Sequence, residues 1–433
     1  MPVSNYDLYK YAVILLLIFM LNIRYTLEES NFCGIHEEDK CSNKINNPAN
    51  RYILYDINPP EGFNLRRDVY MRLAVLGNLL KKSKNNKLKN FKIVLPPWSE
   101  LYHWRSQTYN MHIPWSHFFD LGSLQKFAPV IEMYQFFNEV GSNYEQLIID
   151  EVFILQNFED MFETGNFEDK MAVEECTENE TVNFYKYDNL TSNNIRCLSF
   201  HGHASQLISL LEKSTSNSIL FDHAEIVLHD RFGDRTFWEA RRSMRFSKKL
   251  RFIANEFREK YLNSTDELDN TFIPEDWTTE TPHRNAKGGP YICVHLRRRD
   301  FVWGRPSEVP DIEHAARQIK HLLQKYNLNT VFVATDAPLK EYNNLKGELS
   351  KYKVHKYSPS GEIMEKHKDG GVAIIEQIIC SHAFYFIGTH ESTFSFRIQE
   401  EREILGFPID RTFNRLCGTN KKCEKPSLWK IVF

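Results

Sequence analysis

Short apolar runs alternate with longer amphipathic stretches along most of the chain, a pattern typical of a parallel α/β protein. The first unit begins with an apolar run at 52–57 and a loop at 58–64, with Asn64 as the expected N-cap of a helix over 65–82. A second apolar run at 91–95 ends at two prolines and completes a strand–helix–strand unit.

The same alternation continues to the C-terminus with one polar interruption. A long charged helix is predicted over 237–260, followed by a polar linker or insertion at 261–288. Two successive α/β halves of similar size predict two Rossmann-like domains facing across a cleft, over 51–245 and 246–433. Further strands are predicted at 147–149, 152–155, 218–221, 291–296, 330–334 and 384–387, and further helices at 311–326, 372–382 and 394–404.

The N-terminal segment has the features of a secretory leader. Residues 12–21 form an uninterrupted apolar run, shorter than the roughly 20 residues that span a bilayer. We therefore expect a signal peptide at 1–25, with an uncleaved anchor as the alternative, and an irregular segment at 26–50. Expected glycan acceptors on a secreted surface are the sequons at Asn179, Asn189 and Asn263.

The sequence contains 8 cysteines, which agrees with an oxidising compartment. Cys293 and Cys380 stand inside apolar runs and are predicted to be free, buried thiols. Zinc binding is disfavoured because no C-x2-C pair is present. Disulfides are predicted for the locally spaced pairs Cys33 with Cys41, Cys176 with Cys197, and Cys417 with Cys423.

Composition and charge limit the classes of function. The chain of 433 residues is 42% hydrophobic and has a formal net charge of −3, which describes a globular protein and gives no sign of nucleic-acid binding. The sequence has no D-x-D motif, which many nucleotide-sugar transferases use to hold a divalent metal. His201 and His203 are candidate metal ligands, but two histidines without a nearby cysteine or carboxylate make a weak site.

Three strand-to-helix junctions carry polar chemistry at the position where open α/β sheets bind ligands. The first is the proline-stiffened loop at 58–64, in which Glu61 is a candidate general base beside a helix N-terminus. The alternative is a solvated carboxylate that stabilises the helix dipole. Gly62 is expected to allow a positive φ or a close backbone approach.

The second junction is an arginine cluster after the strand at 291–296. Alternation directs Arg297 and Arg299 to one side and Arg298 to the other. Guanidinium groups bind phosphate oxygens in a bidentate manner, so we expect one arginine to hold a pyrophosphate and another to pair with Asp300. A purely structural salt-bridge cluster is the alternative.

The third junction is the hydroxyl-rich loop at 388–395, which leads into a helix. Its backbone amides favour an anion, with Ser392 and Thr393 as added donors, and N-capping by either side chain is the alternative. Aromatic residues around Trp98, Trp104 and Trp115 suggest a groove for a protein acceptor, although core packing is the favoured interpretation.

At these junctions the sequence resembles a known family. The motifs are RYILYDINPPEGFNLRRDVY, VLPPW, LYHW, IPWSHFFD, GGPYICVHLRRRDF, VFVATDA, DGGVAIIEQ and STFSFRIQEEREILG. Together, and in this order, they resemble the protein O-fucosyltransferases, specifically the family that acts on thrombospondin type 1 repeats. The resemblance extends from about residue 51 to the C-terminus.

The resemblance implies a GT-B fold and inverting, metal-independent transfer of fucose from GDP-β-L-fucose to Ser or Thr hydroxyls of folded thrombospondin repeats, giving α-O-fucose. It implies that Glu61 is the general base, that Arg297 stabilises the leaving group, and that Glu401 is an acidic residue important for activity. The donor-binding residues it implies are Pro60, Glu61, Gly62, Phe63, Asn64, His295, Leu296, Arg297, Asp369 at the guanine edge, Ser392, Thr393 and Phe394.

Three other functions are kept as alternatives. The first is O-fucosylation of EGF-like repeats, and the second is a secreted binding protein that has lost catalysis. The third, a glycosidase, is disfavoured because the arginine cluster would have no role. We expect a monomer in the lumen of the endoplasmic reticulum or the Golgi, without nucleic acid and without membrane contact beyond the leader.

Overall fold

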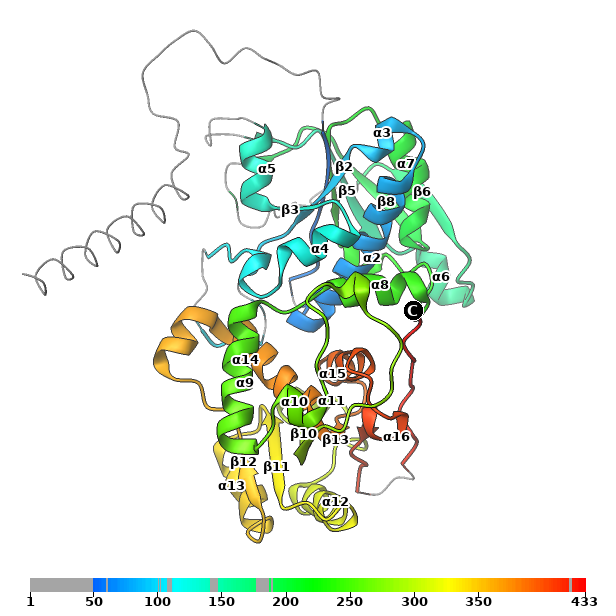
Figure 1. The fold of residues 1–433 in the computed structure, drawn as a ribbon. Helices are drawn as coiled ribbons and strands as arrows, with labels where there is room; N and C mark the ends of the chain where they lie inside the picture. Colours follow the sequence, from blue (N-terminus) through cyan, green and yellow to red (C-terminus); the bar gives the residue numbers. More distant parts are fainter. Residues whose placement is uncertain are drawn as a thin grey trace, which may run out of the picture. The chain divides into compact units, whose positions relative to one another are not determined.

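Two parallel sheets organise the part of the chain that the computed structural model describes (Figure 1). The described residues are 50–59, 61–99, 101, 103–106, 111–140, 147–176, 187, 190–419 and 423–433. Contacts group the described residues into one compact unit.

The first sheet is built from the first half of the chain. Its strands pair in parallel except for β6, which runs antiparallel to β8 along one edge. Such a sheet needs crossover connections, which the intervening helices supply. In spatial order the strands are β3 (Val130–Glu132), β2 (Phe91–Leu95), β1 (Arg51–Tyr55), β9 (Ser218–Asp222), β5 (Glu151–Gln156), β8 (Ile195–His201) and β6 (Lys170–Glu174).

The second sheet is entirely parallel and belongs to the second half. Its central strand is β10, paired with β11 on one side and β13 on the other. In spatial order the strands are β12 (Lys353–His355), β11 (Thr330–Thr335), β10 (Gly289–Leu296), β13 (Ala383–Gly388) and β14 (Asn414–Arg415). A separate parallel pair joins β4 (Leu147–Ile148) to β7 (Leu190–Thr191).

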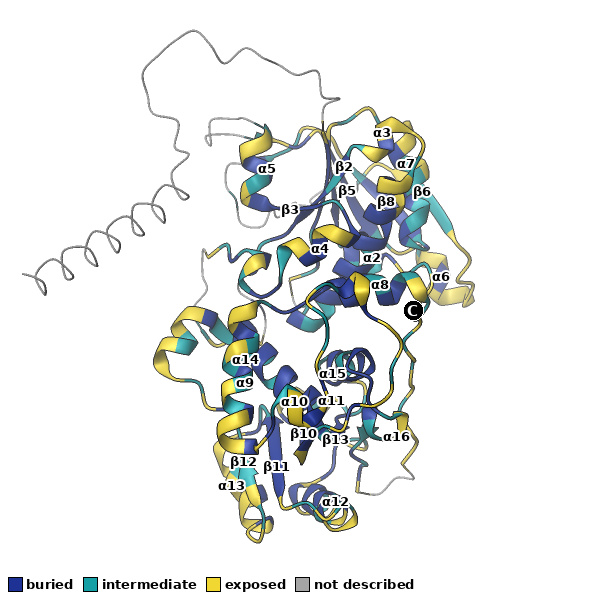
Figure 2. Ribbon diagram, viewed as in Figure 1, coloured by how far each residue is buried: buried dark blue, intermediate teal, exposed yellow. Residues whose placement is uncertain are grey.

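Both faces of each sheet are covered, which explains why the strands are continuous apolar runs. In β1, Ile53 and Tyr55 pack with helix α2 (Phe63–Lys82), whereas Leu54 packs on the other face with helix α5 (Met133–Val140). In β10, Cys293 faces helix α14 (Gly361–Ser381) and Val294 faces helix α12 (Ile312–Lys325). Figure 2 shows the buried strands between helices that expose their outer sides.

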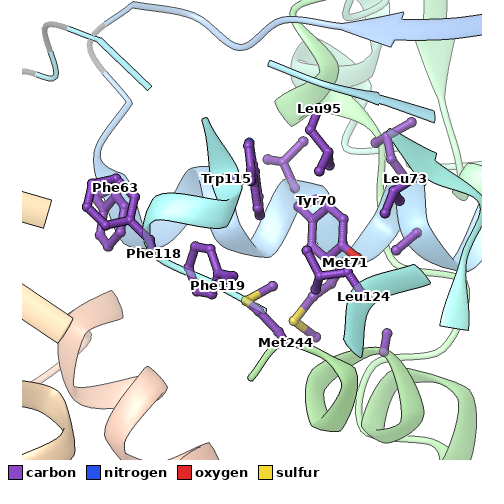
Figure 3. Close-up of a cluster of buried hydrophobic side chains, with 14 of the residues drawn as sticks. Phe63, Tyr70, Met71, Leu73, Leu95, Trp115, Phe118, Phe119, Leu124 and Met244 are labelled. Carbon is purple, nitrogen blue, oxygen red and sulfur yellow. The ribbon is translucent and has the colours of Figure 1, made fainter. Parts of the chain in front are cut away.

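The largest hydrophobic cluster includes residues from both sheets and contains most of the aromatic segment predicted from the sequence. Trp98 and Trp115 are 2% and 1% exposed, and their rings lie 4.7 Å apart. Figure 3 shows Trp115 beside Tyr70 and Phe119. The core-packing interpretation is therefore confirmed for these two tryptophans.

The helices follow the predicted pattern, with two corrections. The region predicted as one helix over 237–260 forms two helices. The chain turns between them at Arg245, whose side chain points inward and forms an ion pair with Glu280. The predicted linker at 261–288 contains short helices, and Trp277 in it is buried.

The helices of the first half are α2 (Phe63–Lys82), α3 (Asn86–Lys89), η1 (Trp115–His117), α4 (Leu121–Phe127), α5 (Met133–Val140), α6 (Glu159–Thr164), η2 (Ala204–Leu207), α7 (Ile208–Lys213), η3 (Ala224–Ile226) and α8 (Arg235–Ser243). Those of the second half are α9 (Lys248–Leu262), α10 (Asp266–Asp269), η4 (Trp277–Thr279), α11 (Arg299–Gly304), α12 (Ile312–Lys325), α13 (Leu339–Glu348), α14 (Gly361–Ser381), α15 (Thr393–Ile404) and α16 (Ile409–Thr412).

The disulfides correct one prediction from the sequence. Cys293 and Cys380 are not free thiols: they form a disulfide that joins β10 to α14. The pairs Cys176–Cys197 and Cys417–Cys423 are confirmed. Cys33 and Cys41 lie outside the described residues, as do Asn179 and Asn189, whereas Asn263 is exposed at the end of α9. Within the described ranges, every helix is too short or too polar to cross a bilayer.

Candidate active site

A cavity of about 730 Å³ lies where the predicted junctions meet, at the carboxyl ends of β1, β10 and β13. It brings together residues that are far apart in the sequence and belong to both sheets. Leu296 is buried in the core, Glu401 lies away from the cavity, and Pro60 is outside the described residues. The predicted residues that line it are Glu61, Gly62, Phe63, Asn64, His295, Arg297, Asp369, Ser392, Thr393 and Phe394.

Glu61 stands in the cavity wall just before helix α2. Its amide donates to the carbonyl of Asn58 at 3.0 Å, which tightens the loop. Burial and the nearby Glu225 raise the pKa of Glu61, while Arg66 opposes them. A carboxylate with a raised pKa is a stronger base, which suits a group that removes a proton.

The residues that follow Glu61 differ in two details from the prediction. Gly62 has a φ of −81°, so a positive φ is not needed there, but a Cβ at this position would lie 3.2 Å from His103. Close approach is therefore the reason for glycine. Gly62 is also the N-cap of α2, and Asn64 lies inside the helix, where its side chain accepts hydrogen bonds from Arg67 and Gln377.

Arg297 reaches the cavity from the end of β10. Its Nε and Nη2 donate to the two carboxylate oxygens of Asp300 at 2.9 and 3.0 Å, and Asp336 lies 3.2 Å from Nε. Among the described residues, Nη1 has no hydrogen-bond partner. The cation is thus held in place by two carboxylates with one edge of its fork available to a phosphate oxygen.

The other two arginines of the cluster have structural roles. Arg298 is buried, and it donates to Glu341 at 2.6 Å and to the carbonyl of Pro310 at 2.7 Å. Arg299 is exposed and donates to the carbonyl of Asp336 at 3.0 Å. The prediction that a second arginine pairs with Asp300 is wrong, because Arg297 itself makes that ion pair.

His295 is buried one residue before the end of β10. Its Nδ1 lies 2.8 Å from the hydroxyl of Ser395, and its ring stacks on Phe394 with centroids 4.3 Å apart. Burial and the charge of Arg297 lower the pKa of His295 to about 3, so the ring is neutral at physiological pH. Thr389 ties the two strand ends together by donating to the carbonyl of His295 and accepting from the amide of Arg297.

The N-terminus of α15 opens into the cavity at Ser392, Thr393 and Phe394. Ser392 is the N-cap residue, but its side chain makes no capping hydrogen bond. The alternative of ordinary side-chain capping is therefore wrong. Amides at an uncapped helix N-terminus favour a negatively charged group.

Asp369 faces the cavity from a kink in α14, where Lys368 has a φ of 52°. The amide of Ser106 donates to Asp369 Oδ2 at 2.7 Å, and the Ser106 hydroxyl donates to the same oxygen. The carboxylate is therefore engaged by a pair of donors from a loop of the first half of the chain.

Several cavity residues were missed by sequence reasoning because tertiary contacts bring them there. They include His103 and Ser106 from the first half and Lys356 and Glu376 from the second. Asp336 could have been predicted as a cavity residue from the sequence, because it directly follows a buried strand. Burial raises the pKa of Glu376 to about 8, with Lys356 opposing the shift and Asp336 adding to it.

Glu401 lies in α15 two turns beyond the cavity. It accepts from Arg241 at 2.8 Å, and Glu400 accepts from the same guanidinium at 2.7 Å. Burial alone would raise the pKa of Glu401, but Arg241 and Arg245 outweigh burial and lower it. Glu401 therefore lies outside the cavity, and its importance for activity stays a prediction.

The candidate metal ligands are separate from this cavity. His203 pairs with Asp169 at 3.0 Å, and His201 lies 3.2 Å from the carbonyl of Glu168. Among the described residues, no group of three or more His, Cys, Asp and Glu side chains is arranged to hold a metal ion.

Two Rossmann-like lobes line one cavity, with arginine and a helix N-terminus on one side and a carboxylate on the other, an arrangement that matches the GT-B fold of glycosyltransferases. The crystal structure of POFUT1 in complex with GDP-fucose has this fold. It superposes with a TM-score of 0.55 at 16% identity, covering 86% of this chain and 99% of that chain.

The family follows from the sequence matches. A family model described as GDP-fucose protein O-fucosyltransferase matches residues 52–405. GDP-fucose protein O-fucosyltransferase 2 of Homo sapiens is 46% identical over 397 residues, covering 88% of this chain and 90% of the relative. The same-named protein of Caenorhabditis elegans is 42% identical over 399 residues, with the same coverage of 88% and 90%. The chain belongs to the GDP-fucose protein O-fucosyltransferase family.

Proposed function

We propose that this protein transfers fucose from GDP-β-L-fucose to Ser or Thr hydroxyls of folded thrombospondin type 1 repeats, with inversion to α-O-fucose and without a metal ion. The observation that carries the proposal is the cavity itself. It places Glu61 on the wall from the first lobe, and Arg297 with the N-terminus of α15 on the wall from the second.

The charges suit a single displacement. Arg297 and the amides at Ser392 to Phe394 stabilise the negative charge that develops on the departing GDP. Glu61 removes the proton of the acceptor hydroxyl as the hydroxyl attacks the anomeric carbon from the opposite side. One displacement inverts the configuration. In this arrangement arginine and helix amides supply the positive charge that a metal supplies in other transferases.

The nucleotide is expected along the carboxyl edge of the second sheet. Asp369 would accept from the guanine edge, and neutral His295, stacked on Phe394, would contact the diphosphate or the sugar. Pro60 belongs to the same loop as Glu61 and is proposed as a further donor contact. Leu296 fills the core beneath the site and supports Arg297 from within β10.

The acceptor class and the compartment are parts of the same proposal. The acceptor rests on the sequence motifs, which resemble the family acting on thrombospondin repeats. The lumen of the endoplasmic reticulum is supported by the disulfides, because disulfides persist in oxidising compartments. The signal peptide at 1–25 and glycosylation at Asn263 are proposed on the sequence alone.

The test measures fucose transfer from GDP-fucose, with EDTA present, to a folded thrombospondin repeat and separately to a folded EGF-like repeat. Transfer to the thrombospondin repeat alone is expected. Transfer to the EGF-like repeat alone would mean that the acceptor is an EGF-like repeat. GDP binding without transfer to either repeat would favour a binding protein that has lost catalysis.

Glu61→Gln tests the general base. We expect fold and GDP affinity to be retained and kcat to fall by about 10²–10⁴, because the amide cannot accept the proton. Arg297→Lys is the companion variant and is also expected to lose activity, since one ammonium does not reproduce the guanidinium fork. Wild-type turnover in Glu61→Gln would remove Glu61 from this role.

A further inference from the structure

We propose that Arg66 and Glu225 are positioning residues that fix the loop carrying Glu61, one from inside helix α2 and the other from η3. The proposal rests on the role proposed above for Glu61 as the general base. Neither side chain lines the cavity, so both would act on the reaction through Glu61.

Arg66 binds the loop through its backbone. Its Nε donates to the carbonyl of Glu61 at 3.1 Å, and its Nη2 lies 3.2 Å from the carbonyl of Ile57 and 3.4 Å from that of Asn58. Its Nη1 lies 3.7 Å from Asp56 Oδ1. The guanidinium therefore holds both ends of the loop, and its planar fork suits this arrangement of acceptors.

Glu225 holds the loop from the opposite element. Its carboxylate accepts the amide of Asn58 at 3.1 Å. The amide of Ala224, the residue before Glu225, donates to the carbonyl of Asp56 at 2.9 Å. The start of the loop is thus tied to η3 by two hydrogen bonds, one of them to a charged group.

The two side chains carry opposite charges beside Glu61. Burial is the main cause that raises the pKa of Glu61; Glu225 raises it further, whereas Arg66 lowers it. Other charged or titratable groups around the loop are Asp56 and Asp222 behind it and, next to Gly62, His103 with its partner Arg297. Arg66 and Glu225 are the ones that also hold the loop by hydrogen bonds.

This arrangement has a consequence for catalysis. A general base must lie within hydrogen-bond reach of the hydroxyl, and a misplacement of about 1 Å lowers the rate by about 10²-fold. The loop precedes α2 and projects its carboxylate into an open cavity, so contacts behind the loop must set the position of that carboxylate.

The experiment compares three variants that separate position from charge. Arg66→Lys keeps the positive charge but loses the guanidinium fork. We therefore expect kcat to fall about 10- to 100-fold, with the same dependence on pH as in the wild type. Arg66→Gln loses both, so kcat falls and the acid limb of the profile moves to higher pH. Glu225→Gln keeps an acceptor for the amide of Asn58 and loses the charge, so the acid limb moves to lower pH.

The direction of each shift follows from the requirement that the base be ionised. Removing a neighbouring cation raises the pKa of Glu61, and activity is then lost at a higher pH. Removing a neighbouring anion lowers that pKa, and activity persists to a lower pH. Each shift is expected to be about half a pH unit or more for a charge at this range. A general loss of stability does not produce shifts of opposite sign.

Arg51→Lys is the matched control. Arg51 lies at the start of β1, at the end of the strand away from the loop, and its guanidinium donates to the carbonyls of Ser214 and Ser216. This variant is expected to unfold at a lower temperature with the wild-type pH profile. GDP affinity and thermal unfolding are measured for every variant, and Glu225→Gln alone remains decisive if the Arg66 variants fail to fold.

Shifts of the acid limb in opposite directions for Arg66→Gln and Glu225→Gln support the proposal. Shifts in the same direction, no shift, or wild-type kcat in Arg66→Lys would overturn it. Failure of the proposed function gives a different result: Glu61→Gln would then keep the wild-type kcat and acid limb. If Glu61→Gln abolishes the acid limb while Arg66→Gln and Glu225→Gln match the wild type, only the positioning roles are wrong.

Discussion

The disulfide between Cys293 and Cys380 is expected to be the most stabilising of those in the described residues. It crosslinks β10, which carries His295 and ends directly before Arg297, to α14, which carries Asp369, so it joins two walls of the cavity. The perturbation is the double variant Cys293→Ala/Cys380→Ala, in which both sulfurs are removed and no unpaired thiol remains.

The magnitude follows from the length of chain that each crosslink closes. In the chain-entropy description, the separation of 87 residues between Cys293 and Cys380 corresponds to about 4.6 kcal/mol at 25 °C. The separation of 21 between Cys176 and Cys197 corresponds to about 3.3 kcal/mol, and the separation of 6 between Cys417 and Cys423 to about 2.2 kcal/mol. The three double-alanine variants should therefore lose stability in this order.

Urea unfolding, followed by tryptophan fluorescence, measures the free energy of unfolding of each variant against the wild type. Iodoacetamide labelling of the unfolded wild type, without reductant, checks that Cys293 and Cys380 are paired. If the Cys293→Ala/Cys380→Ala protein lost less free energy than the Cys417→Ala/Cys423→Ala protein, the argument from loop length would be refuted. Labelling of Cys293 in the unreduced wild type would refute the disulfide itself.

Two further predictions concern Glu401, outside the cavity, and Ser106, in its wall. Glu401→Ala is expected to destabilise the protein by about 3 kcal/mol at neutral pH, because Arg241, 1% exposed, is left with Glu400 as its carboxylate partner. The pKa of Glu401 is lowered in the folded state, so this contribution is present above the ordinary value of 4.5 and is lost as the pH falls through the folded-state value; urea midpoints at neutral and acid pH check this. Ser106→Ala is expected to tighten GDP binding about 2- to 10-fold, since the hydroxyl competes with the guanine edge for Asp369, and weaker binding by calorimetry would contradict that competition.

The sequence was sufficient where the signal is local. Buried parallel strands are continuous apolar runs, and the strands at 52–57, 291–296 and 384–387 were predicted to within two residues at each end. The polar junctions after these strands line the cavity, because the parallel strands of each sheet end at one edge, where ligands bind. Glu61 follows a strand of the first sheet and Arg297 a strand of the second, so their proximity was expected only from the predicted fold of two domains facing across a cleft.

The remaining features depend on contacts between distant segments. The apolar surroundings of Cys293 and Cys380 correctly indicated burial, but nothing local indicates that two buried cysteines 87 residues apart are paired. The sequence did not indicate the break between α8 and α9, because charged residues continue through it. Arg245 at this break is buried in an ion pair with Glu280, which is distant in the sequence. Ser106 reaches Asp369 from a loop whose own sequence has no periodic signal.

The buried charges between α2, α8 and α15 explain how a residue outside the cavity can affect the reaction. Arg67, fully buried, donates to Gln377 of α14 at 2.7 Å and to Asn64 at the start of α2. Arg397 of α15 lies 3.4 Å from Asp68 of α2.

Helix α2 begins just after Glu61, and α15 begins at Thr393, so the same network joins the helix behind the proposed base to the helix that faces the leaving group. Buried arginines without carboxylate partners are costly, and Glu400 and Glu401 supply those partners for Arg241. Loss of Glu401 would therefore mainly change the position of the cavity wall that carries Glu61 relative to the wall that carries Arg297. The predicted importance of Glu401 and a fixed distance between Glu61 and Arg297 would then have the same physical origin.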